Sequence, residues 1–117
     1  MKNNAIVDKS KSFAIHIIKL YKYLVSEKQE YTLSKQVLRS GTSIGANVRE
    51  SLRAQSRADF ISKQNIALKE ADETCYWLEL LHETDFITDN EFENIYAEAN
   101  EIVKLLVSII KTAKANK

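Results

Sequence analysis

The sequence predicts an all-α protein, an antiparallel four-helix bundle with up-down-up-down topology. Proline is absent, and only two glycines occur in 117 residues. This composition favours long helices and disfavours a sheet built on tight turns. Four successive segments place apolar residues at helical spacing, and the stretches between them are short. Because short connections make consecutive helices antiparallel neighbours, a bundle is the simplest arrangement.

Length and composition bound the class of protein. One domain spanning residues 1–117 is long enough to bury a core. The single cysteine, Cys75, excludes an intrachain disulfide and a zinc site built on cysteines, and it fits a reducing compartment. The N-terminus has no signal-peptide pattern, and no stretch approaches about 18 apolar residues. We therefore expect a cytoplasmic protein with no membrane partner.

The first two helices are predicted over residues 7–26 and 32–57. The apolar seam of the first comprises Phe13, Ile17, Leu20 and Leu24. Thr32 is a competent N-cap for the second helix. Gly41 and Gly45 inside it should each cost about 1 kcal/mol relative to alanine. Close approach of another helix would account for these glycines, and a local kink is the alternative explanation.

The two later helices begin with capping signals. Ser56 and Asp59 resemble a capping box, and Thr88 and Glu91 form one. The apolar line of the third helix comprises Phe60, Gln64, Ala67, Ala71, Cys75, Leu78 and Leu81. The fourth helix keeps a strict 3-4 apolar repeat over three heptads. That repeat comprises Phe92, Ile95, Ala99, Ile102, Leu106, Ile109 and Ala113.

The second predicted helix has three faces. Opposite its apolar face, five basic residues fall within an arc of about 80° and a length of about 33 Å. These candidate phosphate contacts are Lys35, Arg39, Arg49, Arg53 and Arg57. A polar seam runs between the two faces and comprises Gln36, Ser40, Ser43, Asn47 and Glu50. The basic row could neutralise phosphates without reading bases.

The seam has two explanations. It is either a buried network that fixes helix register or part of an interface between copies of the chain. Tyr31, Tyr76 and Trp77 could anchor such an interface, since aromatic residues are common interface anchors. Glu70 and Glu73 of the third helix lie close to the seam. We expect one of them to bond either the seam or an arginine of the second helix.

The net charge of +1 conceals an uneven distribution. Residues 1–57 carry 11 Lys and Arg against 4 Asp and Glu, a net +7, and residues 58–117 carry 6 against 12, a net −6. This division can indicate a nucleic-acid partner for the basic half. The alternative explanation is that basic and acidic helices attract each other, within one chain or between copies. We favour this second explanation, since a dedicated nucleic-acid binder usually has a clearly basic total.

No motif indicates catalysis. Glu79 and His82 form a Glu-x-x-His step, but a di-iron bundle needs this step twice and further inward glutamates. Cys75 lies on an apolar line and resembles a small core residue. Phosphate-binding loops and nucleophile elbows are absent from the sequence. We therefore expect a non-enzyme with no metal, no cofactor and no small-molecule substrate.

The segments SKQVLRSGTSIGANVRES and SRADFISKQNIALKEADETCYWLELL resemble a family of small bacterial four-helix bundles. These proteins were first noticed as reading frames in intervening sequences of large-subunit ribosomal RNA genes. The matching residues are Gln36, Arg39, Ser43, Ile44, Asn47, Glu50, Phe60, Ala67, Glu73, Thr74, Tyr76, Trp77 and Leu78. Many members have glycine where this chain has Ser51.

The resemblance implies a four-helix bundle. Accessory proteins of diversity-generating retroelements are similar at a distance, and they are pentameric barrels that work with a reverse transcriptase and nucleic acid. This likeness allows a homopentamer and nucleic-acid binding here. Our hypothesis is a non-enzymatic, self-associating bundle that contacts RNA or DNA through the basic face. The alternative is a protein-interaction scaffold with no nucleic-acid partner.

Overall fold

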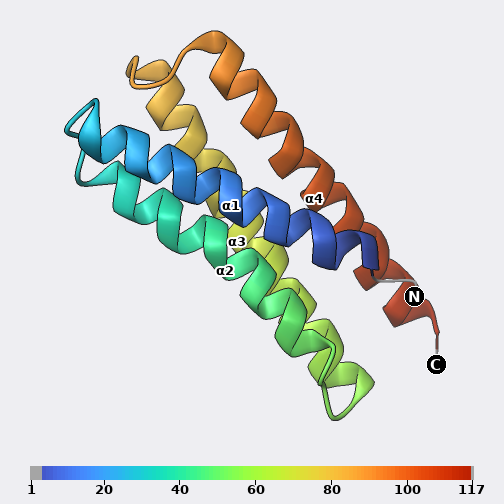
Figure 1. Cartoon of the computed structure of the whole chain (residues 1–117). Coiled ribbons are helices and arrows are strands. Elements are labelled where there is room, and N and C mark those ends of the chain that lie inside the picture. Colours follow the sequence, from blue (N-terminus) through green and yellow to red (C-terminus); the bar gives the residue numbers. More distant parts are fainter. Residues whose placement is uncertain (1–3, 117) are drawn as a thin grey trace.

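The computed structural model describes residues 4–116 and is an elongated bundle of four helices, 49 × 21 × 20 Å (Figure 1). The helices are α1 (Asn4–Ser26), α2 (Leu33–Ser51), α3 (Arg57–Glu83) and α4 (Asp89–Ala115). Helix α1 packs on α2, α2 on α3, α3 on α4, and α4 on α1. The all-α, up-down-up-down prediction is therefore confirmed. Residues 1–3 and 117 of the predicted domain lie outside the described part of the chain.

Each helix contributes a stripe of apolar side chains to one core. The largest fully buried apolar side chains are Ile6, Phe13, Ile17, Leu24, Val37, Ile44, Val48, Leu78, Leu81, Ile102 and Leu106. Burying one such side chain is worth about 1.5–3 kcal/mol, so this stripe pairing is the main stabilising contribution. No described helix is both long enough and apolar enough to cross a membrane.

The ends of α3 and α4 follow local capping rules. The Glu91 N–H donates to Thr88 Oγ1 (3.2 Å) and the Thr88 N–H donates to Glu91 Oε1 (3.0 Å), which confirms the predicted capping box. The Ser56 hydroxyl accepts from the Asp59 N–H at 3.1 Å, as predicted. Helix α3 ends where Asp85 adopts a left-handed φ of 66°, and the chain then turns into α4.

The prediction that Thr32 caps the start of α2 was wrong. Thr32 makes no side-chain cap. The Glu30 carboxylate takes its place and accepts from three N–H groups, those of Thr32 (3.2 Å), Leu33 (2.9 Å) and Ser34 (2.6 Å). A carboxylate is favoured at this position because it also faces the positive end of the helix dipole.

The predicted end of α2 was also wrong, since the helix stops at Ser51 and residues 52–56 form a connection to α3. The last turn tightens: the N–H groups of Leu52, Arg53 and Ala54 bond to carbonyls three residues earlier. This turn frees Ser56 to cap α3. The described part of α1 already includes Asn4, a turn before the predicted start, and Ile6 in this added turn is buried in the core with 1% of its surface exposed.

Close approach of α1 explains the two glycines of α2. A Cβ atom on Gly41 would lie 2.8 Å from Ile17 Cγ1, and one on Gly45 would lie 3.3 Å from Ser10 Oγ. Both glycines have negative φ, so conformational freedom is not the reason for them. They allow α1 to pack against the backbone of α2, and this contact sets the distance between the two basic helices.

Candidate nucleic-acid interface

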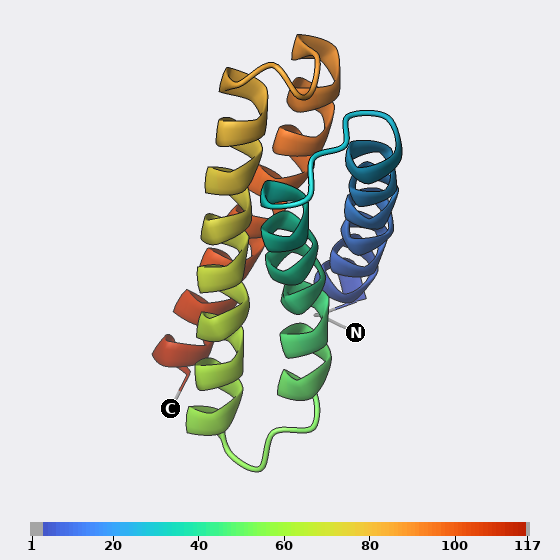
Figure 2. The same ribbon diagram turned by 90° about the vertical axis from the view of Figure 1, so that its left-hand side faces the viewer.

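The five predicted basic residues do not share one helix. Lys35, Arg39 and Arg49 lie on α2, Arg53 lies in the α2–α3 connection, and Arg57 is the first residue of α3. All five are exposed. The prediction of a single basic stripe on α2 was therefore wrong for Arg53 and Arg57, because the helix ends before them. Figure 2 shows the α2–α3 connection at one end of the bundle.

Arg39 is occupied by acidic residues of α3. Its Nη1 lies 3.3 Å from Glu70 Oε1, and its Nη2 pairs with the Glu73 carboxylate. The same Nη2 donates to Gln36 Oε1 at 3.3 Å, and Glu73 also accepts from the Trp77 indole at 3.0 Å. The prediction that Glu70 or Glu73 would bond an arginine of this helix is confirmed for both. A half-exposed cluster of this kind contributes about 1 kcal/mol or less, and it occupies the charge of Arg39.

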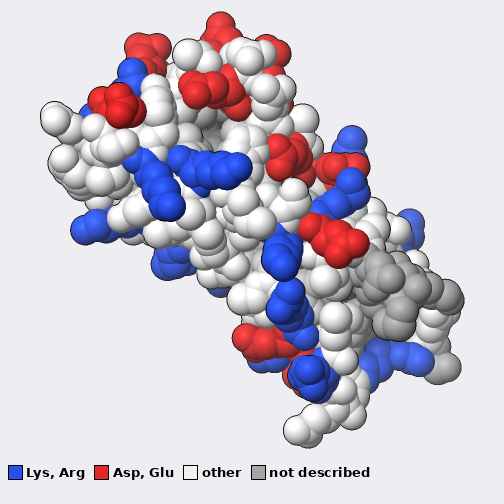
Figure 3. Space-filling view, in the orientation of Figure 1, with Lys and Arg blue, Asp and Glu red and all other residues white. Residues whose placement is uncertain are grey.

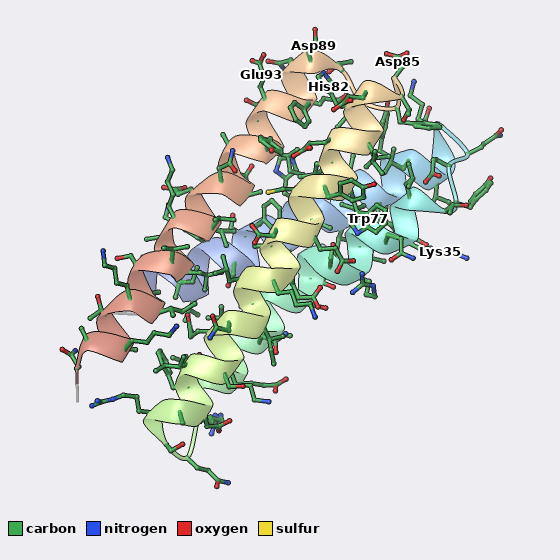
Figure 4. All side chains as sticks on the ribbon, turned by 180° about the vertical axis from the view of Figure 1, so that it is seen from behind. Lys35, Trp77, His82, Asp85, Asp89 and Glu93 are labelled. Carbon is green, nitrogen blue, oxygen red and sulfur yellow. The ribbon has the colours of Figure 1, made fainter. Side chains whose placement is uncertain are left out.

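The other four cations have no such partner. Within residues 4–116, the lysines and arginines in ion pairs are Lys9, Arg39 and Lys63. Arg49, Arg53 and Arg57 follow one another through the end of α2 and the connection. Lys35 lies near the other end of α2, on the side of the bundle where Figure 4 also shows Trp77. Three unpaired arginines therefore gather at the α2–α3 end.

The fold converts the uneven charge of the sequence into two sides of the bundle. Helix α1 has four lysines and one aspartate, and α2 has three basic residues and one glutamate. Helix α3 has three basic and six acidic residues, and α4 has three and five. In Figure 3 positive side chains gather over α1 and the C-terminal part of α2, and most negative ones lie over α4 and the α3–α4 connection. Figure 4 places Asp85, Asp89 and Glu93 at that acidic end.

Four of the five seam residues, Gln36, Ser43, Asn47 and Glu50, do not form a buried network. Ser43 donates to the Arg39 carbonyl (2.6 Å), Asn47 donates to the Ser43 carbonyl (2.9 Å), and the exposed Glu50 pairs with Lys63 of α3 at 3.3 Å. The first two bonds stay within α2, so these side chains cannot fix its register against α3. The buried-network explanation is therefore wrong for these four residues, and only Ser40 of the seam makes a buried contact with α3. The interface explanation stays a prediction.

The buried polar contacts lie closer to the core. The Ser40 and Thr74 hydroxyls are hydrogen-bonded at 2.8 Å, and Gln64 Nε2 donates to Ser51 Oγ at 2.8 Å. Gln64 Oε1 is buried without a partner among the described residues. The sequence held a signal for this pair, because Gln64 interrupts the apolar line of its helix. Ser51 of α2 supplies the partner.

The two histidines each pair with one carboxylate. His16 Nδ1 lies 2.7 Å from Glu98 Oε2, and His82 Nε2 lies 2.7 Å from Asp89 Oδ1. Glu79 accepts from the Tyr96 hydroxyl at 2.6 Å, and this bond is the main cause that raises the Tyr96 pKa to about 12. Among residues 4–116, no three His, Cys, Asp or Glu side chains are arranged to hold a metal ion.

Cys75 is half-buried on α3. Burial, with smaller contributions from Asp72 and Glu79, raises the pKa of its thiol from 9.0 to about 11. A shift of two units leaves about 100-fold less thiolate at pH 8 than in an unfolded chain. We expect iodoacetamide to alkylate the native thiol about 100-fold more slowly than the urea-unfolded one at that pH. The native rate should rise until about pH 11. If the native rate levels off below pH 9, the pKa of Cys75 is not raised and this prediction is wrong.

Comparison with known proteins identifies the family of this chain. The family model of the 23S rRNA-intervening sequence protein matches residues 2–108. The chain belongs to this family. Its resemblance to ribosomal RNA intervening-sequence proteins is thereby confirmed. Four residues of the family-like pattern, Gln36, Arg39, Glu73 and Trp77, meet in the hydrogen-bonded cluster between α2 and α3.

A solved structure is similar over nearly the whole length of this family member. It is the crystal structure, at 1.70 Å resolution, of a protein of unknown function from the S23 ribosomal protein family of Bacteroides thetaiotaomicron VPI-5482. The two chains are 62% identical, with a TM-score of 0.93 over 95% of this chain and 99% of the other. No curated protein matches the chain.

Proposed function

We propose that this protein is a non-enzymatic, self-associating bundle of the cytoplasm that contacts the backbone of RNA or DNA. The contacts are Arg49, Arg53 and Arg57, extended along α2 by Lys35. One observation carries the proposal: the three arginines are exposed at one end of the bundle and have no ion-pair partner within residues 4–116. Arg39 is excluded from the set, because Glu70 and Glu73 already hold its guanidinium.

Contacts of this kind recognise phosphate rather than sequence. Arginine donates to phosphate oxygens, and each contact with a duplex releases condensed counterions. The logarithm of the affinity should therefore fall linearly with the logarithm of the salt concentration. Each contact should add about 0.9 to the steepness of this slope. RNA and DNA duplexes of the same sequence should bind alike, since no base is read.

A salt titration tests this proposal. Fluorescence anisotropy of a labelled duplex of about 20 base pairs gives the affinity at about 50 mM and about 200 mM salt. With four contacts, the three arginines and Lys35, the affinity should fall roughly 150-fold over this range. If the wild-type protein leaves the anisotropy unchanged at the lower salt up to tens of micromolar, the nucleic-acid proposal is wrong.

A scaffold that binds protein alone is the second candidate, and two observations favour it. The Arg39 cluster shows that basic α2 already satisfies part of its charge with acidic α3. Tyr31 and Tyr76 are 54% and 53% exposed, which suits interface anchors. Light scattering at low and high salt tests the self-association, for which a homopentamer is the assembly we propose. A monomer at every salt concentration would rule it out.

A further inference from the structure

A groove of about 310 Å³ runs between α1 and α2 on the basic side of the bundle. Its floor consists of small residues, with Ser10 and Ala14 from α1 and Gly45 and Ala46 from α2. Lys11 and Arg49, one from each helix, also line it. The close helix approach at Gly45 therefore leaves a shallow channel with a cation from each of its two helices.

The side chains of the floor offer no free hydrogen-bond donor to an anion. Ser10 Oγ donates to the Val7 carbonyl at 3.2 Å, and Thr42 Oγ1 donates to the Leu38 carbonyl at 2.7 Å. Recognition of a ligand must therefore come from the two cations. The small residues of the floor leave space, so a bulky group can lie between the two cations without meeting a long side chain.

The two cations of this groove make no ion pair among the described residues, and the nearest acidic residue along α1 is Asp8, one turn before Lys11. No acidic side chain lines the groove. Lys11 and Arg49 are both exposed. The neighbouring Lys9 and Glu50 are engaged elsewhere, with Glu101 of α4 and Lys63 of α3. Two like charges that face one channel repel each other, and a bound anion would remove this repulsion.

We infer that the α1–α2 groove seats a phosphodiester group of a nucleic-acid backbone between Lys11 and Arg49. The path of the backbone then runs from Arg57 and Arg53 across α2 onto α1, rather than along α2 alone. Figure 3 shows positive side chains over both helices on this side. This inference rests on the proposed nucleic-acid contact and adds Lys11, on a different helix, to it.

The test measures duplex affinity for three single variants, each first checked for a wild-type thermal melt. Lys11→Gln removes one charge from the groove and should weaken binding about eightfold at ~0.1 M salt, with the salt slope reduced by about 0.9. Ala46→Leu keeps the charge but fills the groove, and leucine suits this exposed helical position. It should weaken binding by a similar factor. Lys104→Gln on α4 is the matched charge control and should bind within about twofold of wild type.

The outcomes separate this inference from the function on which it rests. If Lys11→Gln and Ala46→Leu bind as wild type while an Arg53→Glu variant does not, the groove assignment is wrong and the nucleic-acid contact stands. If the wild-type protein binds no duplex, both fail. If the two groove variants change the mass in light scattering and leave duplex affinity unchanged, the groove is a contact between copies and the assignment is wrong.

Discussion

The double variant Arg49→Glu/Arg53→Glu should bind a nucleic-acid duplex at least about 100-fold more weakly than wild type at low salt. Each lost phosphate contact accounts for about eightfold at ~0.1 M salt, and the two new carboxylates add repulsion. Fluorescence anisotropy of a labelled duplex measures the change. The free energy of unfolding should stay within about 0.5 kcal/mol of wild type, since both side chains are exposed and neither makes an ion pair among the described residues.

A matched control separates this surface from net charge. Lys104→Glu/Lys111→Glu makes the same change of charge on exposed positions of α4. At the same ~0.1 M salt, charges separated by more than about 10 Å are largely screened. The control should therefore bind within a few-fold of wild type. An equal loss in both double variants would show that binding follows total charge and not the α2–α3 end.

Replacing Gly41 with valine should lower the free energy of unfolding by about 3 kcal/mol. The new Cβ alone would lie 2.8 Å and 2.9 Å from two carbon atoms of Ile17, which is fully buried and cannot turn aside freely. Gly45→Ala is the comparison, because its Cβ meets Ser10 Oγ at 3.3 Å. There a gain of about 1 kcal/mol in helix propensity should offset the crowding. Urea unfolding of the two variants gives both values.

A compensating variant checks the cause of the Gly41 effect. Ile17→Ala alone should cost about 2–5 kcal/mol, because it leaves a cavity. In the double variant Ile17→Ala/Gly41→Val, the valine enters this space, so the combined loss should be clearly smaller than the sum of the single losses. Additive losses would show that the helix contact at Gly41 is not the source of the destabilisation.

The sequence predicted the parts of the fold that depend on local rules. The Thr88–Glu91 capping box and the Ser56 cap use residues three apart, so spacing alone reveals them. The end of α2 escaped prediction, because no glycine or proline follows Ser51 and the amphipathic pattern continues past it. The helix stops there with a last turn of bonds to carbonyls three residues earlier, and Ser56 then caps α3. Glu30 was missed because it caps from outside the helix, two residues before Thr32.

The candidate site was predictable only in part. Charge and spacing identified the basic residues, and proximity to the seam identified the partners of Arg39. Periodicity along one helix could not reveal Lys11, because its relation to Arg49 arises from the packing of α1 on α2. Of the predicted seam residues, only Ser40 makes a buried contact with α3, and the reason is similar. Whether a serine faces solvent or a neighbouring helix depends on helix crossing, and Ser40 and Ser51 face the core.

Mapping amide chemical shifts while a duplex is added tests the central claim most directly. At low salt, the account expects shifts at the α2–α3 connection, at the C-terminal half of α2 and around Lys11 of α1. The acidic end near Asp85, Asp89 and Glu93 should stay unchanged, and salt should reverse the shifts. Shifts that gather at the acidic end, or no shifts at tens of micromolar duplex, would contradict the claim that this bundle uses its basic side to contact nucleic acid.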